Sequence, residues 1–279
     1  VSHTIHGQQL GVINNHAVVQ YLIFDDMTWS YSRLSSFESC PHKFFLTYLY
    51  PAVKRPQFFS SYGSFFHEIM DAFYSGKLRR EELLLYYMSN FHSRVHLPAP
   101  SQKIMSTYYR DGVNALLDYC PVPGNVLACE QEVSFSIADK SFVGVQDLIL
   151  EDRGQLVLLD HKSRSLKPRS GKKKPTKSDL ELDRYLRQLY LYSIPVFNQY
   201  GKYPDKLVLN CYRTNVRIVE PFCHKSFEQA QRWALQTIDR IAETEIWYPE
   251  LDYCRCRHLC DVNLECEYCA MEYGDPRRY

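Results

Sequence analysis

The sequence predicts an α/β fold in which a central mixed β-sheet is flanked by helices and is followed by a cysteine-rich C-terminal segment. Two observations predict this architecture. The apolar residues repeat with a helical period between about residues 63 and 119, and the period then changes to two near Glu132. The predicted elements follow the order helices, three strands, helix, strand and helix, which is typical of a sheet sandwiched between helices.

Helices are predicted over most of the N-terminal part of the chain. Residues 1 to about 27 show no clear period and stay unassigned. Ser32 or Ser35 can cap a short helix that Pro41 interrupts. Apolar residues at helical spacing predict three further helices, over 63–74, about 79–94 and about 101–119.

Three consecutive antiparallel strands are predicted in the middle of the chain. Val133, Phe135 and Ile137 alternate with polar residues, and two further strands follow the short connections at 138–140 and 152–154.

The second half of the domain is predicted to be helix, strand and helix. A capping box at Ser178-Asp179-Leu180-Glu181 opens a helix that we expect to end at Pro195. The stretch KLVLNCYR then predicts a strand over 206–213, and residues 225–246 predict a long closing helix.

Composition limits the classes of protein to consider. The 279 residues are 45% hydrophobic, which is enough for one large domain with an appended module. The net charge is +1, so any affinity for a polyanion must come from local clusters of charge. No apolar run approaches the roughly 18–20 residues of a membrane span, and the start of the sequence lacks signal-peptide features. We therefore expect a soluble, intracellular protein without a membrane partner.

The strand that ends at Lys162 changes abruptly from apolar to charged residues, as LVLL followed by Asp160-His161-Lys162. Asp160 and Lys162 leave the same face of this strand, because successive side chains alternate between faces. Asp147 stands near the middle of the preceding strand, and a hairpin turn at 152–154 would bring it close to Asp160. Two such carboxylates would repel each other without a cation between them, so the pattern predicts a Mg²⁺ or Mn²⁺ site.

Lys162 beside these carboxylates predicts phosphodiester cleavage. The metal would polarise a phosphoryl oxygen, and the ammonium group would stabilise the negative charge that develops during attack. On these residues alone, an ordinary ion pair between Asp160 and Lys162 at a solvent-facing strand end is an equal alternative.

Four short motifs occur in a fixed order along the chain. They are Gly63-Ser64-Phe65-Phe66-His67, Gly144-Val145-Gln146-Asp147, Asp160-His161-Lys162 and Gln188-Leu189-Tyr190-Leu191-Tyr192. In this order they resemble the PD-(D/E)XK nuclease superfamily, and within it the RecB/AddB-type nuclease domains that include the CRISPR-associated exonucleases. The resemblance covers roughly residues 29–269. It implies a restriction-endonuclease-like core over residues 29–250 and a cysteine-rich, cluster-binding segment over 251–279, after an unassigned segment over 1–28.

The resemblance also implies a role for each matching residue. The metal ligands would be His67, Asp147, Asp160 and the backbone carbonyl of His161. The catalytic set would be Asp147, Asp160, Lys162, Gln188, Tyr192 and Glu132. Glu130 is as plausible as Glu132 for the upstream acidic position. Taken alone, a histidine in an apolar helix is usually structural, and Gln188 and Tyr192 are ordinary helix residues, so only their place in the series supports these roles.

The C-terminal cysteines predict a metal or iron–sulfur site. Five crowd into the last 26 residues: Cys254, Cys256, Cys260, Cys266 and Cys269. Without secretory features, such crowding indicates metal ligation rather than disulfides. The resemblance implies a [4Fe–4S] cluster held by one upstream cysteine, matched here by Cys40, and three C-terminal ones. The family spacing C-x2-C-x5-C is absent, so the choice of three stays open, and structural Zn²⁺ is the alternative.

A basic loop follows the catalytic lysine. It carries eight Lys or Arg residues from Lys162 to Lys177 and no acidic residue. Such a loop beside a phosphodiesterase centre predicts contact with a DNA backbone, although a solvated loop without a role is the alternative. The candidates for DNA contact are Lys167, Arg169, Lys172, Lys173 and Lys174.

These features together predict a metal-dependent deoxyribonuclease. We expect an exonuclease that acts on single-stranded DNA or duplex ends in recombination, DNA repair or CRISPR adaptation. We also expect a helicase or recombination partner and a cytoplasmic location in a bacterium or a phage-infected cell. A sequence-selective endonuclease of the same superfamily and a catalytically silent DNA-binding module are the alternatives. The silent module is disfavoured because the candidate residues His67, Asp147, Asp160 and Lys162 are all present.

Overall fold

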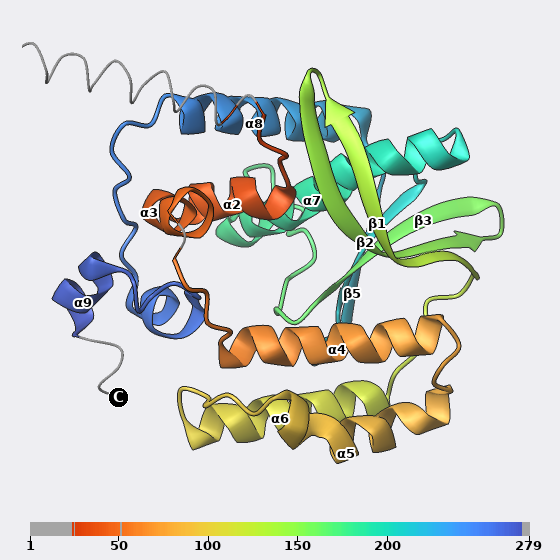
Figure 1. Cartoon of the computed structure of the whole chain (residues 1–279). Coiled ribbons are helices and arrows are strands. Elements are labelled where there is room, and N and C mark those ends of the chain that lie inside the picture. Colours follow the sequence, from red (N-terminus) through yellow and green to blue (C-terminus); the bar gives the residue numbers. More distant parts are fainter. Residues whose placement is uncertain (1–23, 25, 51, 275–279) are drawn as a thin grey trace, which may run out of the picture.

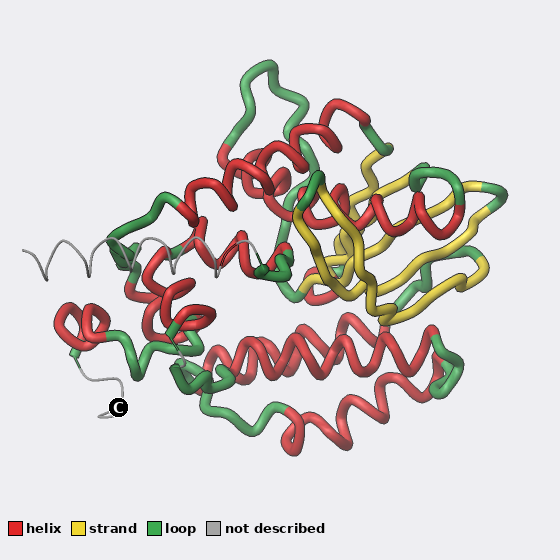
Figure 2. The backbone as a smooth tube through the Cα atoms, turned by 45° about the horizontal axis from the view of Figure 1, so that its top comes forward, coloured by secondary structure: helices red, strands yellow, loops and turns green. Residues whose placement is uncertain are grey.

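The structure is a computed structural model of the 279-residue chain, and it describes residues 24, 26–50 and 52–274. A five-stranded sheet forms its centre, and helices lie on both faces of this sheet (Figures 1 and 2). The strand order is β1-β2-β3-β4-β5, with β3 and β4 parallel and the other neighbouring pairs antiparallel. The predicted α/β fold with a mixed sheet is confirmed.

The strands have the following bounds: β1 (Asn125–Ile137), β2 (Lys140–Asp152), β3 (Gln155–Lys162), β4 (Lys206–Cys211) and β5 (Val216–Pro221). The sequence analysis predicts the first four and misses β5. This edge strand buries only Ile218 among its six residues, so its sequence lacks a strong period of two. The parallel pairing of β3 with β4 requires a crossover, which the chain makes through a long helix.

Three helices cover one face of the sheet: α2 (Tyr31–Ser39), α7 (Lys177–Tyr200) and α8 (His224–Ala242). On this face, Leu156 and Leu158 of β3 pack into the main apolar core. Val157 and Leu159 point the other way, into a smaller core that includes Tyr74 at the end of α4 (Phe58–Tyr74). β3 is therefore buried on both faces, which explains its unbroken apolar run.

A second, aromatic-rich core joins α4 to α5 (Leu83–Arg94) and α6 (Gln102–Leu117), which lie beneath it in Figure 1. A short 3₁₀ turn, η2 (Arg80–Glu82), leads into α5, and another, η3 (Tyr212–Thr214), follows β4. The ring of Tyr212 in η3 stacks on Phe66 of α4 at a centroid distance of 4.0 Å. This contact ties the end of β4 to α4.

The C-terminal segment returns to the first helices of the chain. After α2 come α3 (Pro41–Phe44) and the π-helical turn η1 (Phe45–Leu49), and the C-terminal segment contains η4 (Arg255–Leu259) and α9 (Glu267–Tyr273). Figure 1 shows the blue C-terminal elements beside the orange α3. Trp247 stacks on Phe44 at a centroid distance of 5.7 Å. Among the described residues, no helix is both long and apolar enough to cross a membrane.

Two predicted helix starts need correction. The side chain of Ser30, rather than Ser32 or Ser35, caps α2 by accepting a hydrogen bond from the backbone of Arg33. The capping box of α7 pairs Thr176 with Asp179 instead of Ser178 with Glu181. In both cases the helix begins at least two residues earlier than the sequence pattern indicates.

The predicted end of α7 at Pro195 is also wrong, because the helix continues to Tyr200. Pro195 cannot donate the backbone hydrogen bond that a helix interior requires. However, Pro195 and Val196 are both buried, and this side of α7 packs against the sheet core. Tertiary burial therefore outweighs the local preference of proline. Gly201 ends the helix in the left-handed conformation, with φ of 71°.

Gly112 of α6 generates a test of the helical core. A Cβ atom at this position would lie 2.2 Å from the hydroxyl oxygen of Tyr87, which is fully buried on α5. We expect Gly112→Ala to lower the free energy of unfolding by about 1–3 kcal/mol, because the buried ring has no free space to enter. Urea unfolding followed by circular dichroism measures this change.

Gly63→Ala in α4 is the matched control. The added Cβ atom would lie 3.8 Å from the Oγ atom of Ser163, its nearest neighbour, which is an ordinary van der Waals distance. This change should raise the free energy of unfolding by about 0.5–1 kcal/mol, since alanine favours a helix interior. Equal destabilisation by both substitutions would contradict the close packing of Gly112 on Tyr87.

Candidate active site

The candidate site lies where β2 and β3 separate. The last paired residues of this ladder are Leu148 and Leu159, so the next positions along the two strands are Asp147 and Asp160. Instead of continuing the ladder, the backbone N–H of His161 donates a 2.7 Å hydrogen bond to Oδ2 of Asp147. Asp147 and Asp160 are 8% and 3% exposed. Two carboxylates are thereby buried together at the end of an apolar sheet.

Helix α4 brings His67 to this point. One ring nitrogen, Nδ1, lies 3.6 Å from Oδ2 of Asp147 and 3.3 Å from Oε1 of Glu130 on β1. The other, Nε2, lies 3.1 Å from the carbonyl oxygen of His161. The imidazole therefore joins α4 to three successive strands of the sheet.

A compact set of metal-ligating groups results. One ligand atom from each of His67, Glu130 and Asp147 lies within 4.8 Å of the other two. The carbonyl oxygen of His161 faces the same imidazole. Asp160 is outside this set in the structure, since its carboxylate is engaged by Lys162.

Of the two candidate acids on β1, the structure brings Glu130 into the site and leaves Glu132 exposed. Glu132 is opposite Val145 in the β1–β2 register, two positions beyond the site. Glu130 has φ of 46°, in the left-handed region that a glutamate rarely adopts. This local backbone conformation accompanies the approach of its carboxylate to His67, and no pattern in the sequence distinguishes Glu130 from Glu132.

The site holds protons when no cation is present. Burial and the charge of Asp160 raise the pKa of Asp147 from 3.8 to about 7. Burial lowers the pKa of His67, but its hydrogen bond with Glu130 and the nearby carboxylates outweigh this effect, so the pKa is raised above its usual value. Both ring nitrogens of His67 face oxygen acceptors, which favours the doubly protonated imidazolium.

Lys162 is paired on the α7 side of β3. Its Nζ atom lies 2.6 Å from Oδ2 of Asp160 and donates a 2.9 Å hydrogen bond to Oε1 of Gln188. Burial lowers the pKa of Lys162, but the charges of Asp160 and Asp147 outweigh this and raise it above its usual value. Lys162 is therefore a protonated, partly buried ammonium group with two fixed partners.

Gln188 and Tyr192 form the next layer of contacts. Burial raises the pKa of Tyr192, while a hydrogen bond with Gln188 opposes this shift. The ring of Tyr192 packs on Gly144, where a Cβ atom would lie 2.5 Å from the ring. The glycine of the GVQD motif is therefore required by close packing, and Tyr192 holds Gln188 in position to hold Lys162.

Asn210 is a site residue that the sequence analysis misses. Its side-chain amide lies 2.9 Å from Nδ1 of His161, and the β3–β4 register places the two residues side by side. Burial and the nearby His67 and Lys162 charges lower the pKa of His161 well below its usual value. The side chain of His161 is therefore a neutral structural group that fixes the strand whose carbonyl faces His67. An asparagine at a strand end carries no period or spacing that could have indicated this role.

A family model described as the PD-(D/E)XK nuclease superfamily matches residues 28–272. The chain belongs to this superfamily. Comparison with curated proteins gives no match. Membership of the PD-(D/E)XK superfamily implies a nuclease that uses divalent metal ions and acts on DNA.

The basic loop of this nuclease is anchored to the first turn of α7. The carboxylate of Asp179 accepts hydrogen bonds from the backbone and hydroxyl groups of both Ser170 and Thr176. Arg169 is held by Glu220 at 3.0 Å and by Asp183 at 2.8 Å, so its guanidinium group is engaged within the protein. Arg169 is nevertheless exposed, as are the other four candidates for DNA contact: Lys167, Lys172, Lys173 and Lys174.

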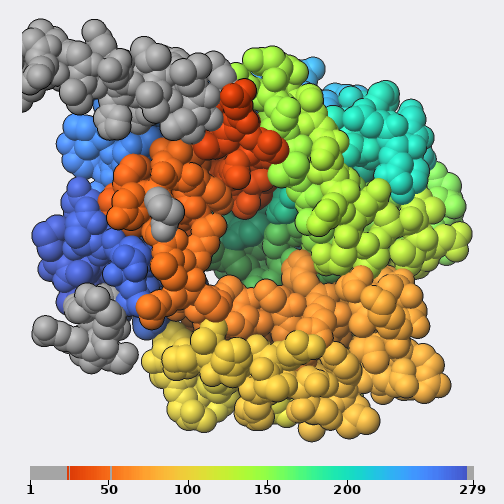
Figure 3. Space-filling view, in the orientation of Figure 1, coloured from red at the N-terminus to blue at the C-terminus, as the bar shows by residue number. Residues whose placement is uncertain are grey.

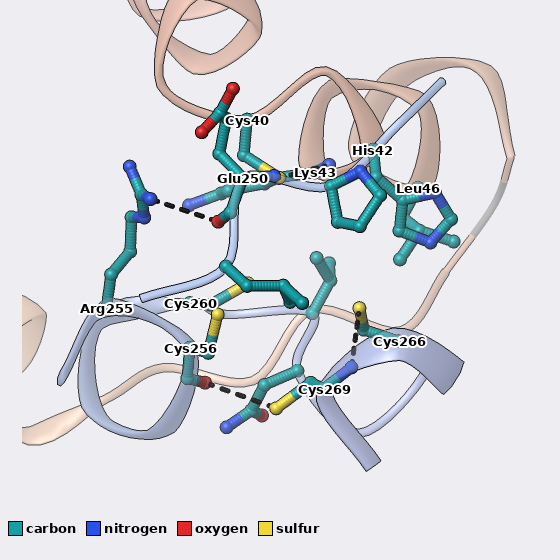
Figure 4. Close-up of a pocket in the computed structure, with 14 residues that line it drawn as sticks. Cys40, His42, Lys43, Leu46, Glu250, Arg255, Cys256, Cys260, Cys266 and Cys269 are labelled. Carbon is teal, nitrogen blue, oxygen red and sulfur yellow. Dashed lines mark hydrogen bonds between the residues drawn. The ribbon is translucent and has the colours of Figure 1, made fainter. Parts of the chain in front are cut away.

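The cysteines gather around one cavity between the start of α3 and the C-terminal segment (Figure 4). Its lining includes five thiols: Cys40, Cys256, Cys260, Cys266 and Cys269. Cys254 is exposed and does not line it. The Sγ atom of Cys40 accepts hydrogen bonds from the backbone N–H groups of Lys43 and Glu250, each at 3.4 Å. The chain thus brings residues more than 200 positions apart to one cavity.

Because Asp147 and His67 hold protons in the metal-free site, we predict that metal binding depends on pH. A divalent cation must displace the proton of Asp147, whose pKa is raised to about 7, and one proton of His67. We expect the apparent Kd for Mn²⁺ to be at least about tenfold larger at pH 6 than at pH 8, because the protonation of Asp147 alone causes a change of this size. Titration calorimetry in buffers of different ionisation enthalpy measures both the affinity and the protons released.

Thermal unfolding provides the companion measurement. The folded, metal-free protein retains protons on Asp147 and His67 that the unfolded chain releases, because both pKa values are raised by folding. The contribution of these protons to the free energy of unfolding is lost as the pH rises through the pKa values of the folded state. Saturating Mn²⁺ should therefore raise Tm more at pH 8 than at pH 6. An equal rise in Tm at pH 6 and pH 8 would contradict the protonation of the metal-free site.

Proposed function

We propose that this chain is a Mg²⁺- or Mn²⁺-dependent exodeoxyribonuclease of the RecB/AddB type. The observation that carries the proposal is the cluster of His67, Glu130 and Asp147 beside the Lys162–Asp160 pair, at the point where β2 and β3 separate. The RecB-type motifs and the cavity shared by Cys40 and the C-terminal cysteines support the exonuclease assignment. Such an enzyme would act in recombination, repair or CRISPR adaptation together with a helicase or recombination partner.

The donor set fits a divalent cation. Carboxylate oxygens and a backbone carbonyl suit Mg²⁺ or Mn²⁺, and the imidazole favours Mn²⁺, since Mg²⁺ prefers an all-oxygen environment. His67, Glu130, Asp147 and the carbonyl of His161 would hold the ion, and Asp160, the next residue along β3 from the end of the β2–β3 ladder, would complete the set. When bound, the ion would polarise a phosphoryl oxygen of the DNA.

The protein contributes a fixed positive charge to the reaction. Asp160 and Gln188 hold the ammonium of Lys162 at the edge of the cation site. In this position it would stabilise negative charge that develops on the attacked phosphate. Tyr192 and Gly144 keep Gln188 aligned through their close packing. Lys162 is thus positioned by side chains from β3 and α7 before any substrate arrives.

Asp160→Asn tests the assignment with little change in volume. We expect the rate of DNA cleavage to fall by ~10²-fold or more, because the variant loses both a candidate metal ligand and the partner of Lys162. End-labelled linear DNA and closed circular DNA, incubated with Mn²⁺, separate exonuclease from endonuclease in one gel. Full activity of the variant would refute the site.

Glu132→Gln is the matched control, since this exposed carboxylate lies two residues from Glu130 on the same strand. Its cleavage rate should equal that of the unmodified protein. Cleavage of closed circular DNA would favour the endonuclease. Binding of DNA without cleavage of either substrate would indicate the silent DNA-binding module.

We further propose that the five-thiol cavity holds a [4Fe–4S] cluster. Four thiolates on one tetrahedral Zn²⁺ would lie about 3.8 Å apart, given Zn–S bonds of about 2.3 Å. Among the described residues, no three cysteine sulfurs lie within 4.8 Å of one another, so the thiols are not arranged as closely as a single zinc ion requires. Hydrogen bonds from backbone N–H groups to Cys40, and from Cys269 to Cys266, would stabilise thiolate ligands.

Cys40→Ser and Cys254→Ser form a matched pair for this site. Loss of Cys40 should abolish the broad absorbance near 400 nm of anaerobically purified protein, with a matching loss of bound iron, because this residue is the one upstream candidate ligand. Cys254→Ser should keep both, since Cys254 lies outside the cavity. Metal analysis of the unmodified protein that finds zinc and no iron would decide for Zn²⁺.

A further inference from the structure

A cleft beside the candidate active site is lined by residues to which no function has been assigned above. It lies between the N-terminal helices and the first half of α7, and it has a volume of about 470 Å³. Its lining includes the tyrosines Tyr31, Tyr48 and Tyr185 and the cations Lys43, Lys54, Arg164 and Arg184. In Figure 3 the molecule is hollowed between the N-terminal helices, α4 and the sheet.

The cleft and the active site meet at Tyr185. The ring of Tyr185 lines the cleft, and the Nζ atom of Lys162 lies 5.8 Å from its centroid. Tyr185 precedes Gln188 by three residues on α7, so the two side chains lie on neighbouring positions of one helix face. A chain that occupied the cleft would therefore lead directly to Lys162.

The charges of the cleft favour a polyanion. Its acidic residues are already paired: Asp261 with Lys43 at 2.8 Å, Glu181 with Arg164 at 3.8 Å, and Glu38 with Arg187 at 3.1 Å. Within the described part of the chain, Lys54 and Arg184 have no acidic partner. Lys54 lies over the ring of Tyr48 at 5.2 Å. The unpaired charges of the cleft are thus positive.

We infer that this cleft binds single-stranded DNA, with Tyr185 stacking on the base next to the cleaved phosphate and with Lys54 and Arg184 contacting backbone phosphates. Aromatic rings alternating with cations are typical of sites for unpaired strands, because every unpaired base offers a face for stacking. A duplex keeps those faces inside its own stack, so stacking on Tyr185 favours an unpaired strand over a duplex. The inference rests on the proposed nuclease function and names its substrate.

Binding to fluorescent oligonucleotides tests this inference without turnover. Full-length protein in EDTA is titrated into a labelled 20-nucleotide oligo(dT) or a labelled blunt 20-base-pair duplex, and anisotropy gives Kd. Tyr185→Ala should weaken binding to oligo(dT) about tenfold, while Tyr185→Phe, which keeps the ring, should bind like the unmodified protein. Lys54→Ala and Arg184→Ala should each reduce the slope of log Kd against log salt concentration by about 0.7.

Lys225→Ala is the matched charge control, because this exposed lysine in the first turn of α8 does not line the cleft. It should leave the salt slope unchanged. Unchanged oligo(dT) binding by Tyr185→Ala, Lys54→Ala and Arg184→Ala would overturn the inference, as would an equal loss of duplex binding. Cleavage of DNA by the unmodified protein in Mn²⁺ is scored separately, so a failed cleft and a failed nuclease assignment give different results.

Discussion

The burial of Asp147 and Asp160 at one end of the sheet is the constraint on which the site depends. Two carboxylates that are almost inaccessible to water must be balanced by positive charge, or one must keep its proton. The chain supplies Lys162 to Asp160, and the N–H of His161 and the ring of His67 to Asp147. Because these groups come from β3 and α4, the charge balance fixes the position of the helix on the sheet. The same balance leaves a proton on the carboxylates that a divalent cation can replace.

The topology of the sheet explains why the other groups arrive where they do. β3 continues into a crossover through α7 and returns as the parallel strand β4, so α7 must lie over the end of β3. Lys162 faces that helix and meets Gln188, while the carbonyl of His161 is left facing α4. Gly144 allows α7 to approach closely enough for Tyr192 to support Gln188. One connection thus places Gln188, its support from Tyr192 and one wall of the adjoining cleft on the helix that faces Lys162.

The sequence predicts the parts of this arrangement that have a period or a motif. The apolar run of β3, the helix carrying His67 and the hairpin that brings Asp147 near Asp160 could be found in this way. The choice of Glu130 could not, because a left-handed residue within a strand is a tertiary effect that leaves no local pattern. Nor could Asn210 or Tyr185, whose contacts depend on how β4 and α7 lie against β3. The end of α7 could not be predicted for the same reason: burial of Pro195 keeps the helix intact, although proline locally favours a helix end.

The cysteine-rich C-terminal segment forms part of one wall of the cleft and is held by a few specific contacts. In the described stretch 249–274 the buried apolar side chains are Val262 and Cys269, which is a small core for so long a segment. It is fastened instead by polar contacts, including Lys43 with Asp261 and the backbone N–H of Arg55 donating to the Asp261 carbonyl. Asp261 also lines the cleft, so one wall of the cleft depends on how this segment is held. Ligation of Cys40 together with C-terminal thiols would cross-link the segment to α3 and thereby fix the wall that faces the DNA strand.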